Sequence, residues 1–397
     1  MLHEDLAEVQ SLVAGARSTQ DIFPAMALRE VSVDERLVML EEEYVVLVRR
    51  LRPERFAGNS LAQNSARHLL SKLYDWHQRA VQELEQQRPI GETASVAPST
   101  SDGPIEQVRS PSPRLRSVPN PPPNSEVDFT VTTQAGAYRV QRILAQGDLA
   151  MLYRGSCVSG GRSGQDVTVK VVMQREDKDL LLEEARILQI LQATEGAQRK
   201  HLPEVLDQFQ SPSGQAGTIF SYLDGHDLDE VRERYPDGLD AEHVAWVLAR
   251  SLSGLGFAHQ QGIIHGNIEP AHILVRPADH NVFLIDWTYA VVAPEKTGQG
   301  FRAHNPDFSP PEVMARKPPL PASDLYSLGK TMIYLLGGDV RQGTLPPRVD
   351  ERFARFLQFM IRESPRQRAQ DAWEVAEQLV QLRVEVFGPP RFVPLEM

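Results

Sequence analysis

Residues 262–274 read Gly-Ile-Ile-His-Gly-Asn-Ile-Glu-Pro-Ala-His-Ile-Leu, and this stretch decides how the whole chain is interpreted. Three of its side chains restrict the chemistry available here. The amide of Asn267 cannot accept a proton at neutral pH, and the carboxylate of Glu269 repels other anions. The imidazole of His272 offers nitrogen, which hard cations such as Mg²⁺ disfavour as a ligand. We therefore expect neither a proton acceptor at position 267 nor a magnesium ligand at position 272.

This stretch resembles the catalytic loop of protein kinases, for which the family pattern is H-R-D-L-K-P-x-N-I-L. The frame of that pattern is retained at His265, Pro270, Ile273 and Leu274. The catalytic base, the phosphate-facing Lys and the metal-binding Asn of the family are replaced by Asn267, Glu269 and His272. The resemblance therefore implies a kinase fold whose usual catalytic groups are missing, which is a pseudokinase.

Further kinase motifs surround this loop at the spacing of the family. Gly147 is the remaining glycine of the Gly-rich loop, and Lys170 ends the strand that resembles V-A-I-K. Glu184 lies on the following helix, Tyr222 lies at the hinge between the lobes, and Asp286 occupies the position of the D-F-G aspartate. The resemblance implies that these five residues bind the nucleotide, with Asp286 as the ligand of a metal ion.

Two alternatives remain open for the nucleotide site. The pair between Lys170 and Glu184 could be a structural ion pair that braces the small lobe without a nucleotide, and Glu183 could replace Glu184 as the partner. Thr288 stands where the family has glycine, which removes backbone freedom. We therefore expect the segment around Asp286 to be locked in one state.

Four residues of the large lobe resemble the scaffold of the family. His265 belongs to the catalytic loop, and Asp324 is expected to accept hydrogen bonds from its backbone. Glu312 ends the activation segment, and the resemblance pairs it with Arg368. These four positions imply that the architecture of the lobe is retained.

The fold class expected is α+β, with a two-lobed kinase-like fold whose β-rich small lobe precedes a helical large lobe. Residues 1–88 have the apolar spacing of a small helical domain, and residues 89–135 form a Pro- and Ser-rich linker that is expected to be disordered. The kinase-like domain is placed at 136–386, and 387–397 form a tail. Ser110 and Ser112 of the linker are candidate phosphorylation or docking sites, although the composition favours a solvated tether.

The N-terminal region resembles a J-domain over roughly residues 22–85. The segment that begins at Tyr44 has the spacing of its second helix and loop, but Arg52-Pro53-Glu54 replaces the H-P-D motif. The resemblance implies a contact with a chaperone through residues 1–88. The alternative is a generic helical hairpin or three-helix bundle that docks a protein.

Composition excludes several classes of function. The chain of 397 residues is 41% hydrophobic, which is ordinary for a globular protein, and no apolar run is long enough to span a membrane. The start of the chain lacks the pattern of a secretory signal, and the single cysteine, Cys157, excludes an internal disulfide. The formal net charge of -11 argues against a nucleic-acid partner. We expect a cytoplasmic protein.

Taken together, these patterns predict a pseudokinase that acts as a protein-interaction or allosteric scaffold for unidentified protein partners. ATP is expected to bind weakly and without conventional phosphotransfer, and a requirement for Mg²⁺ is left open. One alternative is an atypical, active serine/threonine protein kinase that uses ATP. Another is a co-chaperone-like adaptor that acts through the N-terminal helices.

Overall fold

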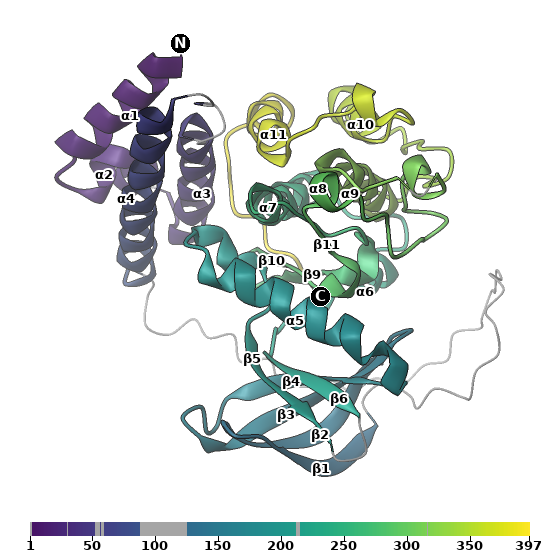
Figure 1. Cartoon of the computed structure of the whole chain (residues 1–397). Helices are drawn as coiled ribbons and strands as arrows, with labels where there is room; N and C mark the ends of the chain where they lie inside the picture. The colour runs from purple at the N-terminus through teal and green to yellow at the C-terminus, as the bar shows by residue number, and fades with distance from the viewer. Residues whose placement is uncertain are drawn as a thin grey trace.

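The computed structural model describes residues 2–29, 31–51, 56, 59–87, 125–211, 215–315 and 317–397. Three parts follow one another along the chain: a group of N-terminal helices, a six-stranded sheet with one long helix, and a helical lobe (Figure 1). The Arg52-Pro53-Glu54 segment, most of the predicted linker, and Ser110 and Ser112 within it lie outside the described residues. The predictions made for them therefore stay predictions.

The N-terminal part consists of α1 (Leu2–Gly15), α2 (Thr19–Ile22), the 3₁₀ turn η1 (Pro24–Ala27), α3 (Val33–Arg50) and α4 (Ser60–Glu85). Apolar side chains at helical spacing meet in a core of their own, which includes Phe23, Leu40 and Leu73. The side chain of Asn59 caps α4 by accepting a hydrogen bond from the backbone N–H of Ala62 at 3.0 Å.

The small lobe is an antiparallel sheet in the order β1-β2-β3-β4-β6-β5. Side chains that alternate along the strands, such as Val167 and Val169, form its core. The helix α5 crosses the sheet (Figure 1). The strands and this helix are β1 (Glu126–Thr132), β2 (Gly136–Gln146), β3 (Ala150–Gly160), β4 (Asp166–Val172), β5 (Val205–Gln210), β6 (Ala216–Ser221) and α5 (Lys178–Ala193).

The position of β1 differs from the prediction, because this strand lies inside the segment 89–135 that was expected to be a linker. Val127, Phe129 and Val131 do alternate, but Phe129 stays 40% exposed and only Val131 is buried. The strand is held mainly by its pairing with β2. A short apolar pattern next to a proline-rich run does not predict such a pairing.

The large lobe contains α6 (Leu228–Arg234), α7 (Ala241–Gln260), α8 (Pro294–Thr297), α9 (Pro321–Leu335), α10 (Glu351–Met360) and α11 (Ala372–Phe387). Its core is centred on buried aromatic side chains, including Trp287, Phe353 and Trp373. The α+β, two-lobed fold class predicted from the sequence is thus confirmed. In the described part of the chain, no helix has the length and apolarity that a membrane crossing requires.

Two small sheets of the large lobe bring distant segments together. β8 (Ile263–Ile264) pairs with β11 (Val291–Val292), and β9 (Ile273–Arg276) pairs with β10 (Asn281–Leu284). Residues 265–272, which resemble the catalytic loop of kinases and are called the catalytic stretch below, connect β8 to β9. The segment that carries Asp286 connects β10 to β11. Since both pairings are antiparallel, the two connections lie side by side.

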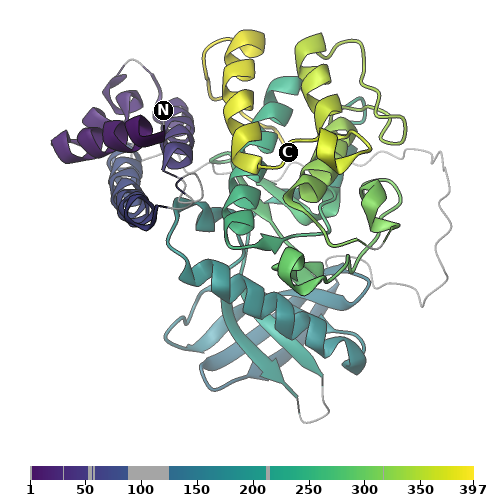
Figure 2. The ribbon, with the colours of Figure 1, turned by 45° about the horizontal axis from the view of Figure 1, so that its top comes forward.

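The N-terminal helices rest against the large lobe (Figures 1 and 2). α3 contacts α11, and α4 contacts the 3₁₀ turn η4 (Ala197–His201), which follows α5. Ala197 is buried among the N-terminal apolar side chains and belongs to their core. The apolar core of this part therefore continues onto the lobe.

The C-terminal segment is irregular after α11 but packs on the lobe. The ring of Phe392 stacks on His280, with 4.0 Å between the ring centroids, and Leu395 is buried. The hydroxyl of Tyr235 donates a hydrogen bond to the backbone carbonyl of Glu396 at 2.7 Å.

Candidate active site

Lys170 is the centre of a buried polar cluster between the lobes. Its ammonium group lies 2.8 Å from Oε2 of Glu184 and 2.6 Å from Oδ1 of Asp286, and it donates to the hydroxyl of Thr288 at 2.7 Å. The three partners come from α5, from the end of β10 and from the 3₁₀ turn η6 (Trp287–Tyr289). Glu183, the alternative partner, instead forms an exposed pair with Arg186. The structure therefore joins Lys170 to Glu184 and adds Asp286 to the pair.

Charges in this cluster offset the effect of burial on its pKa values. Burial acts to lower the pKa of Lys170, but the carboxylates of Asp286 and Glu184 hold it above its ordinary value. Burial acts to raise the pKa of Asp286, but Lys170 and His272 hold it well below its usual range. Burial raises the pKa of Glu184. We conclude that, of the two carboxylates that face Lys170, Asp286 is the more firmly ionised.

The backbone of the catalytic stretch is anchored by Asp324, which lies on α9. The backbone N–H groups of His265 and Gly266 each donate to its carboxylate at 2.8 Å, and Nε2 of His259 lies 2.8 Å from the same group. The ring of His265 donates from Nε2 to the carbonyl of Ile285 at 3.0 Å. Burial lowers the pKa of His265 to about 4, so this ring is neutral at physiological pH.

His272 connects the other two altered positions, Asn267 and Glu269, to Asp286. Nδ1 of His272 donates to the backbone carbonyl of Asn267 at 2.8 Å. Nε2 of the same ring lies 3.2 Å from Oδ2 of Asp286 and 3.6 Å from Oε1 of Glu269. The other carboxylate oxygen of Glu269 accepts a hydrogen bond from the side chain of Asn305. The side chains of His272, Glu269 and Asp286 are 14%, 20% and 26% exposed, so solvent reaches this group.

Two predicted site residues of the small lobe, Tyr222 and Gly147, make contacts outside the Lys170 cluster. The backbone N–H of Tyr222 donates to the carbonyl of Asp166, and its ring lies under the guanidinium of Arg154 at 4.3 Å. The backbone N–H of Gly147 donates to Ala150 across the hairpin. Their roles at the hinge and in the Gly-rich loop stay predictions.

Glu312 and Arg368 form a buried pair at the base of the large lobe. The guanidinium donates to both carboxylate oxygens, at 2.8 and 2.9 Å. The hydroxyl of Ser323, near the start of α9, donates to the same carboxylate at 2.9 Å. This pair fixes the end of the segment that follows Asp286.

The contacts of two site residues, Thr288 and Asn305, could not be predicted from the sequence. In the sequence, Thr288 indicates only a loss of backbone freedom relative to glycine. In the structure, its hydroxyl accepts a hydrogen bond from Lys170 and donates one to Asp286 at 2.6 Å. Asn305 carries no motif, so nothing in the sequence points to its bond with Glu269.

The donor set of the site fits one magnesium ion bound together with a nucleotide. Across the described ranges, no group of three or more His, Cys, Asp or Glu side chains has the geometry to hold a metal ion alone. Mg²⁺ typically takes one or two protein carboxylates together with phosphate oxygens. Asp286 suits that arrangement, whereas the nitrogen of His272 does not suit a second Mg²⁺.

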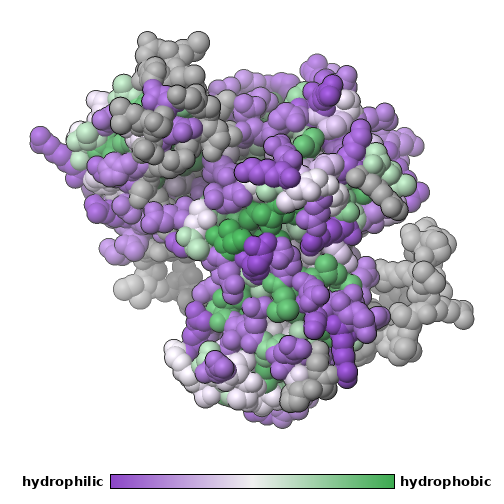
Figure 3. Space-filling view, in the orientation of Figure 1, coloured by the Kyte–Doolittle hydropathy of each residue, from purple (hydrophilic) through white to green (hydrophobic). Residues whose placement is uncertain are grey.

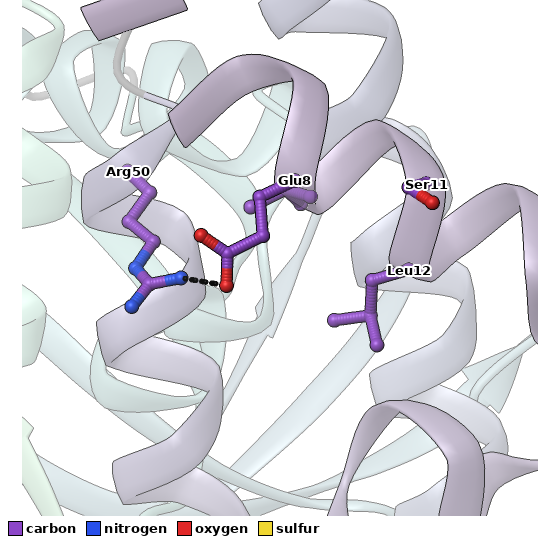
Figure 4. Close-up of a pocket in the computed structure, with 5 residues that line it drawn as sticks. Glu8, Ser11, Leu12 and Arg50 are labelled. Carbon is purple, nitrogen blue, oxygen red and sulfur yellow. Dashed lines mark ion pairs between the residues drawn. The ribbon is translucent and has the colours of Figure 1, made fainter. Parts of the chain in front are cut away.

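A separate hollow lies on the N-terminal helices, between α1 and α3 (Figure 4). It is lined by Glu8, Val9, Ser11, Leu12 and Arg50. An ion pair of 3.2 Å between Arg50 and Glu8 crosses one side of it. None of these residues belongs to the Lys170 cluster.

Comparisons with known proteins identify the two-lobed part. The family model of the protein kinase domain matches residues 138–378. Serine/threonine-protein kinase F of Synechocystis is 35% identical over 130 residues, which cover 31% of this chain and 26% of that protein. Serine/threonine-protein kinase pkn3 of Myxococcus xanthus is 28% identical over 53% of this chain and 39% of its own length. Serine/threonine-protein kinase PAK mbt of Drosophila melanogaster is 28% identical over 60% of this chain and 39% of its own length.

These comparisons correct the prediction of a non-catalytic scaffold. The interpretation as a pseudokinase, and with it the expectation that the chain is not an enzyme, is wrong, because the similar proteins are named as serine/threonine kinases. That prediction gave the replacements at positions 267, 269 and 272 more weight than the kinase motifs that the chain retains. The chain spans less than half of the length of each of these relatives. Because the family model covers more than half of the chain, and because the fold and the Lys170 cluster agree with it, the chain belongs to the protein kinase domain family.

Proposed function

We propose that this chain is an ATP-dependent serine/threonine protein kinase that transfers the γ-phosphoryl group of ATP to a hydroxyl group of a protein. The observation that carries this proposal is the position of Lys170, whose ammonium group is held by Glu184 at 2.8 Å and by Asp286 at 2.6 Å. The match to the protein kinase domain and the names of the similar proteins support it.

Each member of the cluster has a part in this reaction. Lys170 binds phosphate oxygens, and Glu184 keeps its ammonium group in place. Asp286 provides the carboxylate for a nucleotide-bound Mg²⁺, which would neutralise charge that develops on the phosphoryl oxygens. The hydrogen bonds from His265 and Gly266 to Asp324 hold the catalytic stretch in register with these groups. Positioning and electrostatic stabilisation supply most of the rate enhancement in phosphoryl transfer.

The face where the lobes meet suits a protein substrate as well as a nucleotide. The space-filling view shows apolar residues gathered at this junction, while hydrophilic residues cover most of the rest of the same face (Figure 3). The substrate polypeptide of the proposed kinase would bind at this junction.

The experiment combines binding with phosphotransfer. Thermal unfolding of the full chain is measured with ATP and Mg²⁺, and transfer of radiolabelled phosphate to the chain itself and to a mixed serine/threonine peptide library is followed. Ligand that binds only the folded state raises the melting temperature by mass action. We expect a raised melting temperature and labelled product for the wild type, and neither for Lys170→Ala. The matched control is Lys72→Ala, which removes an exposed lysine of α4 and should behave as the wild type. Absence of labelled product from the wild-type chain would refute the proposed function.

A further inference from the structure

The amide at position 267 cannot take the proton of an attacking hydroxyl, so a carboxylate must be sought among its neighbours. Glu184 is 2% exposed and is bound to Lys170. Asp324 is 1% exposed and already has three nitrogen partners. Asp286 faces Lys170, Thr288 and His272. Each of these three carboxylates is therefore committed to other groups.

Glu269 differs from these carboxylates in its contacts, and it is also more exposed than Glu184 and Asp324. Its side chain is 20% exposed, one oxygen accepts from Asn305, and the other lies 3.6 Å from Nε2 of His272. An ionised carboxylate has roughly four acceptor sites, so Glu269 retains acceptor capacity beside these two contacts. Nε2 of His272 lies 3.6 Å from this carboxylate and 3.2 Å from that of Asp286, so one imidazole links Glu269 to Asp286.

We propose that Glu269 is the catalytic residue that orients the acceptor hydroxyl and takes its proton, in place of the residue at position 267. This inference rests on the proposed function. Glu269 lies two positions beyond Asn267, on the same short connection between β8 and β9. The carboxylate can therefore come from position 269 instead of position 267 without a change in the path of the backbone.

The neighbours of Glu269 act as positioning residues. His272 is fixed through Nδ1 to the carbonyl of Asn267, and its Nε2 lies between the carboxylates of Glu269 and Asp286. Asn305 holds Glu269 from the opposite side, from the segment before η7 (Pro311–Val313). Catalysis requires such control of orientation, because small displacements of a reacting group cost large factors in rate.

The step balances with ATP as the only co-reactant. The hydroxyl oxygen of serine or threonine forms a bond to the γ-phosphorus, and the bond between this phosphorus and the β–γ bridging oxygen breaks. The hydroxyl proton passes to the carboxylate of Glu269 and from there to solvent. The products are ADP and a phosphorylated side chain.

The test compares Glu269→Gln with Glu374→Gln, which removes an exposed carboxylate of α11. Loss of a general base typically lowers the rate by about 10²–10⁴-fold. We expect a fall of this size in kcat for Glu269→Gln, with an unchanged KM for ATP and an unchanged shift in melting temperature with ATP and Mg²⁺. We expect no change for Glu374→Gln. We also expect the double variant Asn267→Asp with Glu269→Gln to recover part of kcat, because it returns a carboxylate to the same loop.

The outcomes separate this inference from the proposed function. Wild-type transfer together with a kcat of Glu269→Gln within about twofold of wild type overturns the inference alone. A loss in Glu269→Gln that comes with a lost nucleotide shift, or that Asn267→Asp does not relieve, assigns a structural role to Glu269 and also overturns it. If the wild-type chain transfers no phosphate, the proposed function fails and this inference fails with it.

Discussion

Arg368 donates hydrogen bonds to both carboxylate oxygens of Glu312, and both side chains are almost completely buried. The two residues lie far apart in the sequence, so the pair joins the end of the activation segment to the loop before α11. Removal of one partner from a buried ion pair leaves an uncompensated charge, which typically costs about 3–5 kcal/mol.

We therefore expect Arg368→Ala to lower the free energy of unfolding by about 3–5 kcal/mol. Denaturant unfolding of the full chain measures this value. The control is Arg355→Ala, since Arg355 forms an exposed pair with Glu351 whose contribution is expected to be below about 1 kcal/mol. Equal losses in the two variants would contradict the prediction.

A second prediction concerns Asp324, which accepts hydrogen bonds from the backbone of His265 and Gly266. Asp324→Asn keeps the shape of the side chain but replaces one acceptor oxygen by a donor, so one backbone N–H loses its partner. We expect a loss of about 1–3 kcal/mol in stability, and a fall in phosphotransfer larger than the fall in ATP binding. Steady-state kinetics and the thermal shift with ATP distinguish the two effects. A variant with wild-type kinetics would show that this anchor does not position the catalytic stretch.

A third prediction concerns the contact between the N-terminal helices and the large lobe. Ala197 is buried in the N-terminal core, so the long charged side chain of Ala197→Arg cannot be accommodated there. We expect the helices to separate from the lobe, with a larger radius of gyration in small-angle X-ray scattering. Ala197→Gly serves as the control and should keep the wild-type radius. An unchanged radius in Ala197→Arg would mean that the contact tolerates a large side chain.

The fourth prediction is a dependence of stability on pH. Burial, together with the nearby charges of His243 and Arg250, lowers the pKa of His280 to about 3, although Asp279 opposes this shift. Burial lowers the pKa of His265 to about 4. In the unfolded chain a histidine has a pKa near 6.5, so between about pH 6.5 and these values the unfolded state binds protons that the folded state does not.

The free energy of unfolding should therefore fall as the pH falls from about 6.5 to about 4, with a slope of up to about 1.4 kcal/mol per pH unit for each histidine. His280→Asn should reduce this slope, and asparagine tolerates the positive φ of 53° at this position. Urea denaturation at several pH values provides the measurement. The same slope in the variant and the wild type would assign the pH dependence to other groups.

The order of strands and helices predicted the fold class, and the resemblance to kinase motifs predicted the pairing of Lys170 with Glu184. A strand that ends in lysine and a helix that presents glutamate on its apolar face are visible in the sequence, because both signals extend over only a few residues. The contacts of Thr288 and Asn305 could not be predicted. They join residues that are far apart in the chain, Lys170 with Thr288 and Glu269 with Asn305, and local sequence carries no signal for such contacts.

The error about catalysis has the same origin. Position by position, Asn267, Glu269 and His272 each lack the group that the family uses there. In space, the imidazole of His272 lies 3.2 Å from Asp286 and 3.6 Å from Glu269, and no spacing rule in the sequence provides these contacts. The neighbours of each altered residue, rather than its identity alone, determine what the group can do.

The crowding of partners around Lys170 has a consequence for affinity. Its ammonium group already faces two carboxylates and a hydroxyl, so an arriving phosphate must exchange with these acceptors rather than fill an empty coordination shell. Nucleotide affinity is then a difference between two nearly balanced sets of interactions. A small change in that balance, such as the loss of the Thr288 hydroxyl, can alter affinity strongly in either direction, and weak binding of ATP would reflect competition within the site.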